Sequence, residues 1–124
     1  MSVSIGNVAV FVSDLTRSEA FYTALGLEVI ARIETPRYRE VIVRNAAEGS
    51  QLMLATDAEH GGPVQPSGFW KVYLATDDAA GLYRRALEAG GTSVAEPYRL
   101  EQFNITIGMV ADPDGYVVEL GQRH

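Results

Sequence analysis

The sequence predicts an α+β fold made of two βαβββ modules, with mixed sheets curled into a cup and the helices outside. The prediction depends on a repeat in which a strand and a capped helix near residue 8 recur further along the chain. Asp14 is as far from Asp78 along the chain as Gly26 is from Gly90. A strand–helix pattern that recurs in register indicates two modules of one architecture.

The composition is typical of one globular domain. The chain has 124 residues, of which 47% are hydrophobic, so it can bury a core without disulfides. It contains no cysteine, which excludes disulfides, thiolate zinc sites and cysteine nucleophiles. A formal charge of −6 argues against nucleic acid and anionic membranes as partners, since clustered Lys and Arg hold both.

No targeting segment or membrane span is expected. The first residues lack the basic and small-residue pattern of a signal peptide, and no apolar run approaches the ~20 residues that cross a bilayer. We therefore expect a cytoplasmic protein that interacts with small molecules or other proteins.

The first module is expected to cover residues 1–57. Its opening strand has an apolar face formed by Val8, Val10 and Val12. A helix should follow, because Ser13 and Asp14 are capping residues and Gly26 is a typical stop. The segment 16–19 also fits a capping box. Further strands are expected at about 28–33, 39–44 and 51–55.

A linker over 56–68 and a second module over 67–124 are expected next. The linker contains two prolines and three glycines. The second module repeats the order of the first, with a strand at 69–75, a helix at 79–89 and strands near 93–98, 103–110 and 116–121. Its segment 112–115, Asp-Pro-Asp-Gly, is a tight turn whose role should be structural.

Each opening strand has a mixed face opposite its apolar one. This face carries Asn7 and Phe11 in the first module, and Lys71 and Tyr73 in the second. Mixed faces of this kind usually line a pocket. Phe11, Tyr73 and Met53 share this orientation and would suit a planar or hydrophobic ligand, with core filling as the alternative.

Two segments resemble a known family. The runs VFVSDLTRSEAFYTALGLEVI (10–30) and ADPDGYVVEL (111–120) are similar to the vicinal oxygen chelate superfamily. This superfamily includes glyoxalase I, extradiol dioxygenases, fosfomycin-resistance enzymes and bleomycin-resistance proteins. Because it hosts several chemistries and also pure binders, the resemblance implies the fold more than the activity. It also implies a homodimer.

The resemblance implies four metal-ligand positions, which here are Asn7, Met53, Lys71 and Glu119. Of these, Glu119 alone carries a carboxylate. An amide, a thioether and an ammonium are poor ligands for the divalent metals of such sites. We therefore expect no metal and no other cofactor. The histidines, His60 and His124, lie on no predicted cup-facing strand.

The resemblance places Lys71 and Glu119 at the same metal position, and the sequence leaves open whether their side chains pair. One interpretation is an ion pair that fills this position; the others are contact with a ligand's polar group, or acid–base catalysis by either residue. Arg39 at a strand mouth and Asn104 are further candidates for ligand binding. Trp70 is expected under a helix or at a subunit contact.

We expect a metal-independent protein that binds a small, partly apolar organic molecule in a cup between the modules, for sequestration or antibiotic resistance. One alternative is a metal-free isomerase, lyase or cyclase that uses Lys71 or Glu119 as acid or base. Another is a glyoxalase I-like or dioxygenase metalloenzyme with atypical ligands. An interaction module without a small ligand is a third.

Overall fold

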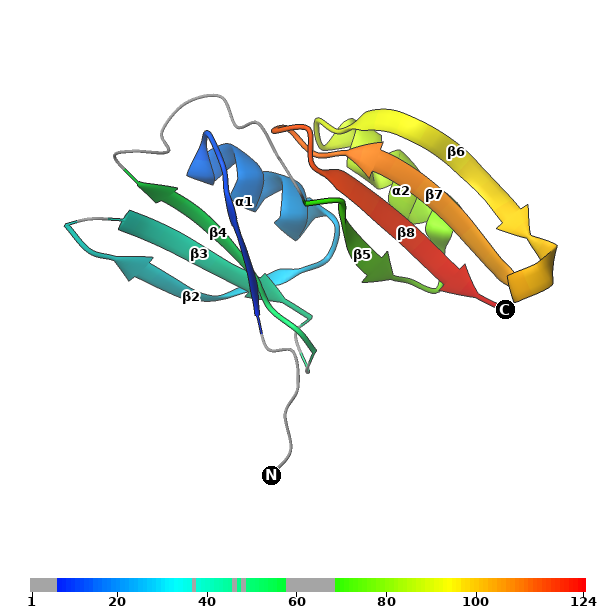
Figure 1. Cartoon of the computed structure of the whole chain (residues 1–124), viewed down its shortest axis with the longest axis horizontal. Helices are drawn as coiled ribbons and strands as arrows, with labels where there is room; N and C mark the ends of the chain where they lie inside the picture. Colours follow the sequence, from blue (N-terminus) through cyan, green and yellow to red (C-terminus); the bar gives the residue numbers. More distant parts are fainter. Residues whose placement is uncertain (1–6, 37, 46, 48, 58–68) are drawn as a thin grey trace. The chain divides into compact units, whose positions relative to one another are not determined.

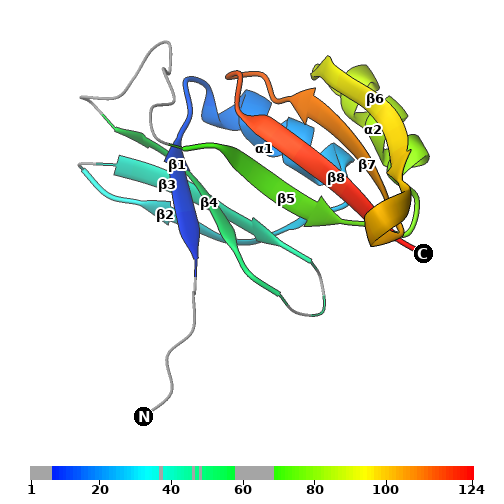
Figure 2. The ribbon, with the colours of Figure 1, turned by 45° about the vertical axis from the view of Figure 1, so that its right-hand side comes forward.

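The computed structural model describes residues 7–36, 38–45, 47, 49–57 and 69–124. The chain divides into two compact units, Met1–Val64 (unit 1) and Gln65–His124 (unit 2). Within its described residues, each unit contains one α-helix and one four-stranded mixed sheet (Figure 1; Figure 2). The predicted pair of βαβββ modules is confirmed.

Unit 1 has its strands and helix close to the predicted positions. Its elements are β1 (Val8–Phe11), α1 (Leu15–Ala24), β2 (Glu28–Glu34), β3 (Tyr38–Arg44) and β4 (Leu52–Asp57). The strand order is β1-β4-β3-β2, in which β1 and β4 are parallel and the other neighbours antiparallel. The predicted linker began too early, because Thr56 and Asp57 pair with β3 as part of β4; the rest of it, 58–68, lies outside the described residues.

Unit 2 repeats this topology. Its elements are β5 (Lys71–Ala75), α2 (Ala79–Glu88), β6 (Thr92–Leu100), the short 3₁₀ helix η1 (Glu101–Phe103), β7 (Ile105–Ala111) and β8 (Val117–Arg123). The strand order is β5-β8-β7-β6, with β5 and β8 parallel. The opening strand therefore begins later than predicted, at Lys71, and η1 separates β6 from β7.

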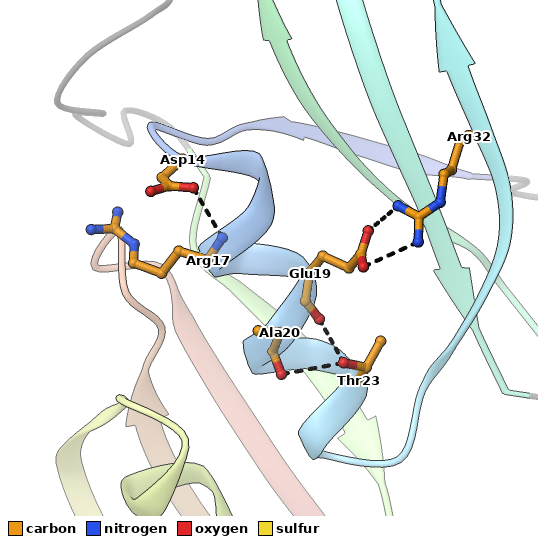
Figure 3. A network of polar contacts seen from close by, with 6 residues as sticks. All are labelled: Asp14, Arg17, Glu19, Ala20, Thr23 and Arg32. Atoms are coloured by element: carbon orange, nitrogen blue, oxygen red, sulfur yellow. Dashed lines mark hydrogen bonds and ion pairs between the residues drawn. The ribbon is translucent and has the colours of Figure 1, made fainter.

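An aspartate caps the N-terminus of each helix. The side chain of Asp14 accepts a hydrogen bond from the Arg17 backbone N–H at 3.0 Å, and Asp78 accepts from the Gly81 N–H at 2.9 Å. A capping carboxylate satisfies one of the free N–H groups of the first turn. The predicted capping box at 16–19 is wrong, because Asp14 is the N-cap and Glu19 bonds elsewhere (Figure 3).

An ion pair ties α1 to the sheet of unit 1. Both terminal nitrogens of Arg32, on β2, donate to the Glu19 carboxylate, one of them at 3.1 Å (Figure 3). This hydrogen bonding from Arg32 lowers the pKa of Glu19 below its ordinary value. Thr23, one turn further along α1, donates its hydroxyl to the carbonyls of Glu19 and Ala20.

The core of each unit lies between its helix and one face of its sheet. In unit 1, Phe21 and Tyr22 of α1 are almost fully buried and meet edge to face at 5.0 Å between ring centroids. The sheet residues that bury completely are Val43 and Leu54 in unit 1 and Val110, Val118 and Leu120 in unit 2. The other face of each sheet, which we call its open face, carries the candidate residues Phe11, Met53, Lys71, Tyr73 and Glu119.

We predict that Asp78→Ala lowers the free energy of unfolding by about 1 kcal/mol, because the Gly81 N–H loses its partner. Urea denaturation measures this difference. The matched control is Asp77→Ala, which removes the same charge from the exposed neighbouring residue and should change stability by less than about 0.5 kcal/mol. Equal losses in both variants would contradict the capping role.

Candidate functional site

The strand register places the implied metal-ligand positions on the last strand of each unit, Met53 and Glu119, at equivalent sites in the two sheets. Ala9 of β1 pairs with Met53 of β4. Tyr73 of β5, the equivalent of Ala9 in the repeat, pairs with Glu119 of β8. Met53 and Glu119 therefore occupy corresponding places on the two open faces. This equivalence follows from the parallel pairing of the first and last strands in each unit.

Lys71 and Glu119 form an ion pair on the open face of unit 2. The Lys71 Nζ lies 2.7 Å from the Glu119 Oε1. Lys71 reaches Glu119 diagonally, since its direct partner in the register is Val117. The two side chains are 21% and 8% exposed, so the carboxylate is almost fully removed from water. The sequence left this pairing open, and the structure shows it.

The indole of Trp70 lies against the ammonium of the same lysine. The Lys71 Nζ lies 3.8 Å from the centroid of the indole ring, a cation–π geometry. Of the two expectations for Trp70, packing under a helix is wrong, because the residue is 72% exposed and precedes β5; the subunit contact stays a prediction. Strand alternation was extended too far in the sequence, because β5 starts only at Lys71.

Tyr73 lies beside the ion pair on the same face. Its phenol occupies the space next to Gly121, where a Cβ would collide with the Tyr73 hydroxyl. Glycine at this position therefore leaves room for the aromatic ring to lie across β8. Tyr73 is 45% exposed, so the open face of unit 2 carries a phenol beside the ammonium of Lys71 and the carboxylate of Glu119.

Unit 1 carries an amide and a thioether at the two metal-ligand positions that the resemblance implies. Asn7 is exposed just before β1, and Met53 is half-buried in β4. A pocket of about 230 Å³ opens in this unit. Its lining residues are Ala9, Val10, Phe11, Tyr38, Glu40 and Ala55. The pocket is thus apolar and aromatic with one carboxylate.

Phe11, which was assigned from the sequence to the mixed face of its strand, lines this pocket, whereas Tyr38 and Glu40 were not named as candidates. The signal was available in β3, where Val41 and Val43 are buried on the helix side. Because side chains alternate along a strand, Tyr38 and Glu40 face the opposite way. The same alternation puts Arg39 on the helix-facing side, away from the pocket, where it lies 4.0 Å from Glu34. Arg39 does not join the candidate site.

Asn104 stabilises a turn in unit 2. It has a left-handed backbone with φ of 51° and ends η1, so it precedes β7 rather than lying within a strand as predicted. Its side-chain oxygen accepts from Arg99, and its amide nitrogen donates to the His124 carbonyl at 2.9 Å. These bonds occupy the groups that were expected to contact a ligand.

The predicted turn at 112–115 has a structural role. The Asp112 Oδ1 accepts hydrogen bonds from the backbone N–H groups of Asp114 and Tyr116, both at 2.9 Å, and Gly115 has a φ of 91°. Burial raises the pKa of the Tyr116 phenol, and the charges of Asp112 and Asp114 raise it further. The turn leads directly into β8 and so positions Glu119.

The four positions that the resemblance implies for a metal do not fit a divalent cation. The single carboxylate among them, Glu119, is bonded to the Lys71 ammonium, which repels cations. Within the described ranges, no group of three or more His, Cys, Asp or Glu side chains is placed to hold a metal ion. His124 has its Nε2 2.7 Å from the Thr106 hydroxyl, and His60 lies outside those ranges.

Neither helix is a candidate membrane span. In the part of the chain that the structure describes, no helix has the length and hydropathy needed to cross a bilayer.

Similar sequences and structures include several glyoxalases. The chain is 31% identical over 114 residues to a lactoylglutathione lyase of Salmonella typhimurium, an alignment that covers 88% of this chain and 84% of that protein. Glyoxalase I of Zea mays superposes with a TM-score of 0.83 at 25% identity, covering 94% of this chain and 43% of the maize chain. The trypanothione-dependent glyoxalase I of Leishmania major has the same fold, with a TM-score of 0.81, 23% identity and coverage of 98% and 87%.

A family model supports the same relationship over nearly the whole chain. The match extends over residues 4–120 and includes both βαβββ units together with the turn that precedes Glu119. The chain therefore belongs to the glyoxalase/bleomycin resistance protein/dioxygenase superfamily.

Proposed function

We propose that this protein binds a small, partly apolar organic molecule without a divalent metal and sequesters it, as a resistance protein would. The observation that carries the proposal is the 2.7 Å bond between Lys71 and Glu119 on the open face of unit 2. The apolar pocket of unit 1 supplies the binding surface.

The ammonium of Lys71 takes the electrostatic role that a metal would otherwise have. Two unit charges about 4 Å apart attract by roughly 4 kcal/mol at an effective dielectric constant near 20. Removing both groups from water offsets much of that attraction. The pair therefore compensates the charge of Glu119 without adding much to the stability of the fold.

A metal would have to displace this lysine before it could reach Glu119. Displacement would break the bond to Glu119 and the contact with Trp70. The other implied positions offer the amide of Asn7 and the thioether of Met53, neither of which compensates for the lost interactions. The donor set thus favours an organic ligand over a metal ion.

The binding surface in unit 1 is suited to a ring system. Phe11 and Tyr38 line the pocket and are 38% and 40% exposed, so a ligand would remove considerable apolar area from water. Pockets with apolar walls and few polar groups are typical small-molecule sites.

We predict that protein purified without chelators contains substoichiometric Ni, Zn, Mn and Fe by elemental analysis. Lys71→His replaces the ammonium with an imidazole beside Glu119 and should raise the affinity for Zn²⁺ in calorimetric titration. Stoichiometric metal in the wild-type protein would overturn the metal-independent function.

We predict that Lys71→Met lowers the free energy of unfolding by about 2–4 kcal/mol, because it leaves a buried carboxylate without its cation. The double variant Lys71→Met/Glu119→Gln should recover most of the loss in urea denaturation. Arg39→Met is the matched control: it removes a cation from an exposed pair and should cost less than about 1 kcal/mol. If Lys71→Met were as mild as this control, Lys71 would not be compensating Glu119.

A second candidate is a glyoxalase I-type lyase, which the 31% identity to a lactoylglutathione lyase favours. We predict that the wild-type protein neither forms nor breaks down lactoylglutathione, with or without added Zn²⁺ or Ni²⁺. The reason is that the Lys71 ammonium stands at one of the implied metal-ligand positions. Ultraviolet absorbance of the thioester measures the reaction. Metal-stimulated turnover that disappears in Glu119→Gln would establish this candidate instead.

A further inference from the structure

We propose that the pocket of unit 1 selects small organic cations, such as ring-bearing amines, and that Glu40 binds the cationic group. The inference rests on the proposed function and narrows the class of its ligand. It comes from the charge environment of Glu40, a residue that lines the pocket on β3.

Glu40 is a half-buried carboxylate with apolar neighbours on both sides. Its register partners are Ile33 on β2 and Ala55 on β4. A carboxylate that is partly removed from water is unfavourable unless a cation or hydrogen-bond donors compensate it. The neighbouring strands offer no such group at this position.

The described arginines on the sheet of unit 1 either lie beside another carboxylate or are far from Glu40. Arg32 pairs with Glu19, and Arg39 lies near Glu34 on the other face of the sheet. Arg44 shares the face of Glu40 but is four residues further along β3, roughly 13 Å away between backbones. Within the described part of unit 1, no ion pair or hydrogen bond involves the Glu40 carboxylate.

The aromatic residues of the pocket favour the same class of ligand. Phe11 and Tyr38 line it with Glu40, and aromatic faces attract ammonium groups. A cation bound here would meet a carboxylate and two rings, whereas an anion would be repelled by Glu40. The formal charge of the chain, −6, also attracts cations over longer distances.

Two hydrogen bonds tie the backbone of Tyr38, at one wall of the pocket, to Thr35. The Thr35 N–H donates to the Tyr38 carbonyl at 2.9 Å, and the Tyr38 N–H donates to the Thr35 hydroxyl at 3.0 Å. These bonds fix the end of the hairpin that presents Tyr38 and Glu40. A volume of about 230 Å³ lies below the range of drug-sized sites, so the pocket suits one ring with a short arm.

The test compares three ligands of similar shape and different charge: 2-phenylethylamine, 2-phenylethanol and 3-phenylpropionate. Backbone amide NMR titrations of the full chain give an affinity for each and show which residues respond. We expect shifts at 9–11, 38–40 and 55, with the amine binding about tenfold more tightly than the alcohol and the acid binding weakest.

Glu40→Gln should remove the preference for the amine and leave alcohol binding unchanged. The control is Glu34→Gln, which makes the same charge change at an exposed residue on the other face and should keep the preference. If the alcohol or the acid binds at these residues as tightly as the amine, the cation inference fails and the proposed function stands. If none of the three ligands shifts them, both fail.

Discussion

The pairing of the first strand with the last strand in each unit is the constraint on which the site depends. Because β5 and β8 are parallel neighbours, Lys71 and Glu119 meet although they lie far apart in the chain. The helix and two strands that lie between them in sequence are needed to return the chain to this position, since parallel strands require a long crossover. The same pairing of β1 with β4 places Ala55 next to Phe11 in unit 1.

The internal repeat made most of this fold predictable. It shows that two segments of the chain have the same order of strands and helix, which the secondary-structure propensities of single residues do not show. The positions of Lys71, Glu119 and Phe11 follow from strand alternation once the first and last strands are known to pair. Three residues departed from prediction for local reasons. Trp70 precedes its strand, Asn104 adopts a left-handed turn, and Arg39 lies one residue out of phase with the pocket.

The departures have a common physical origin. Alternation identifies faces only inside a strand, whereas the ends of strands are set by turns and hydrogen bonds that the pattern does not encode. Tyr38 lies before the predicted third strand, which began at residue 39, so its side chain was not assigned to a face. Glu40 lies inside that strand, where alternation with Val41 places it on the open face. The volume and the lining residues of a pocket depend on where strands end, so the structure was needed to define the pocket.

The two units share a topology but differ in the charge of their open faces. Replacing a buried ion pair by apolar residues of similar volume is often neutral for stability, so the fold alone does not require Lys71 and Glu119. Their effect is electrostatic, because the lysine cancels the charge of the carboxylate on the face of unit 2. The pocket of unit 1 has no such cancellation at Glu40 among its described residues. Under the proposed function, discrimination between ligands by charge would therefore fall to unit 1, whereas unit 2 presents a locally neutral surface beside Tyr73.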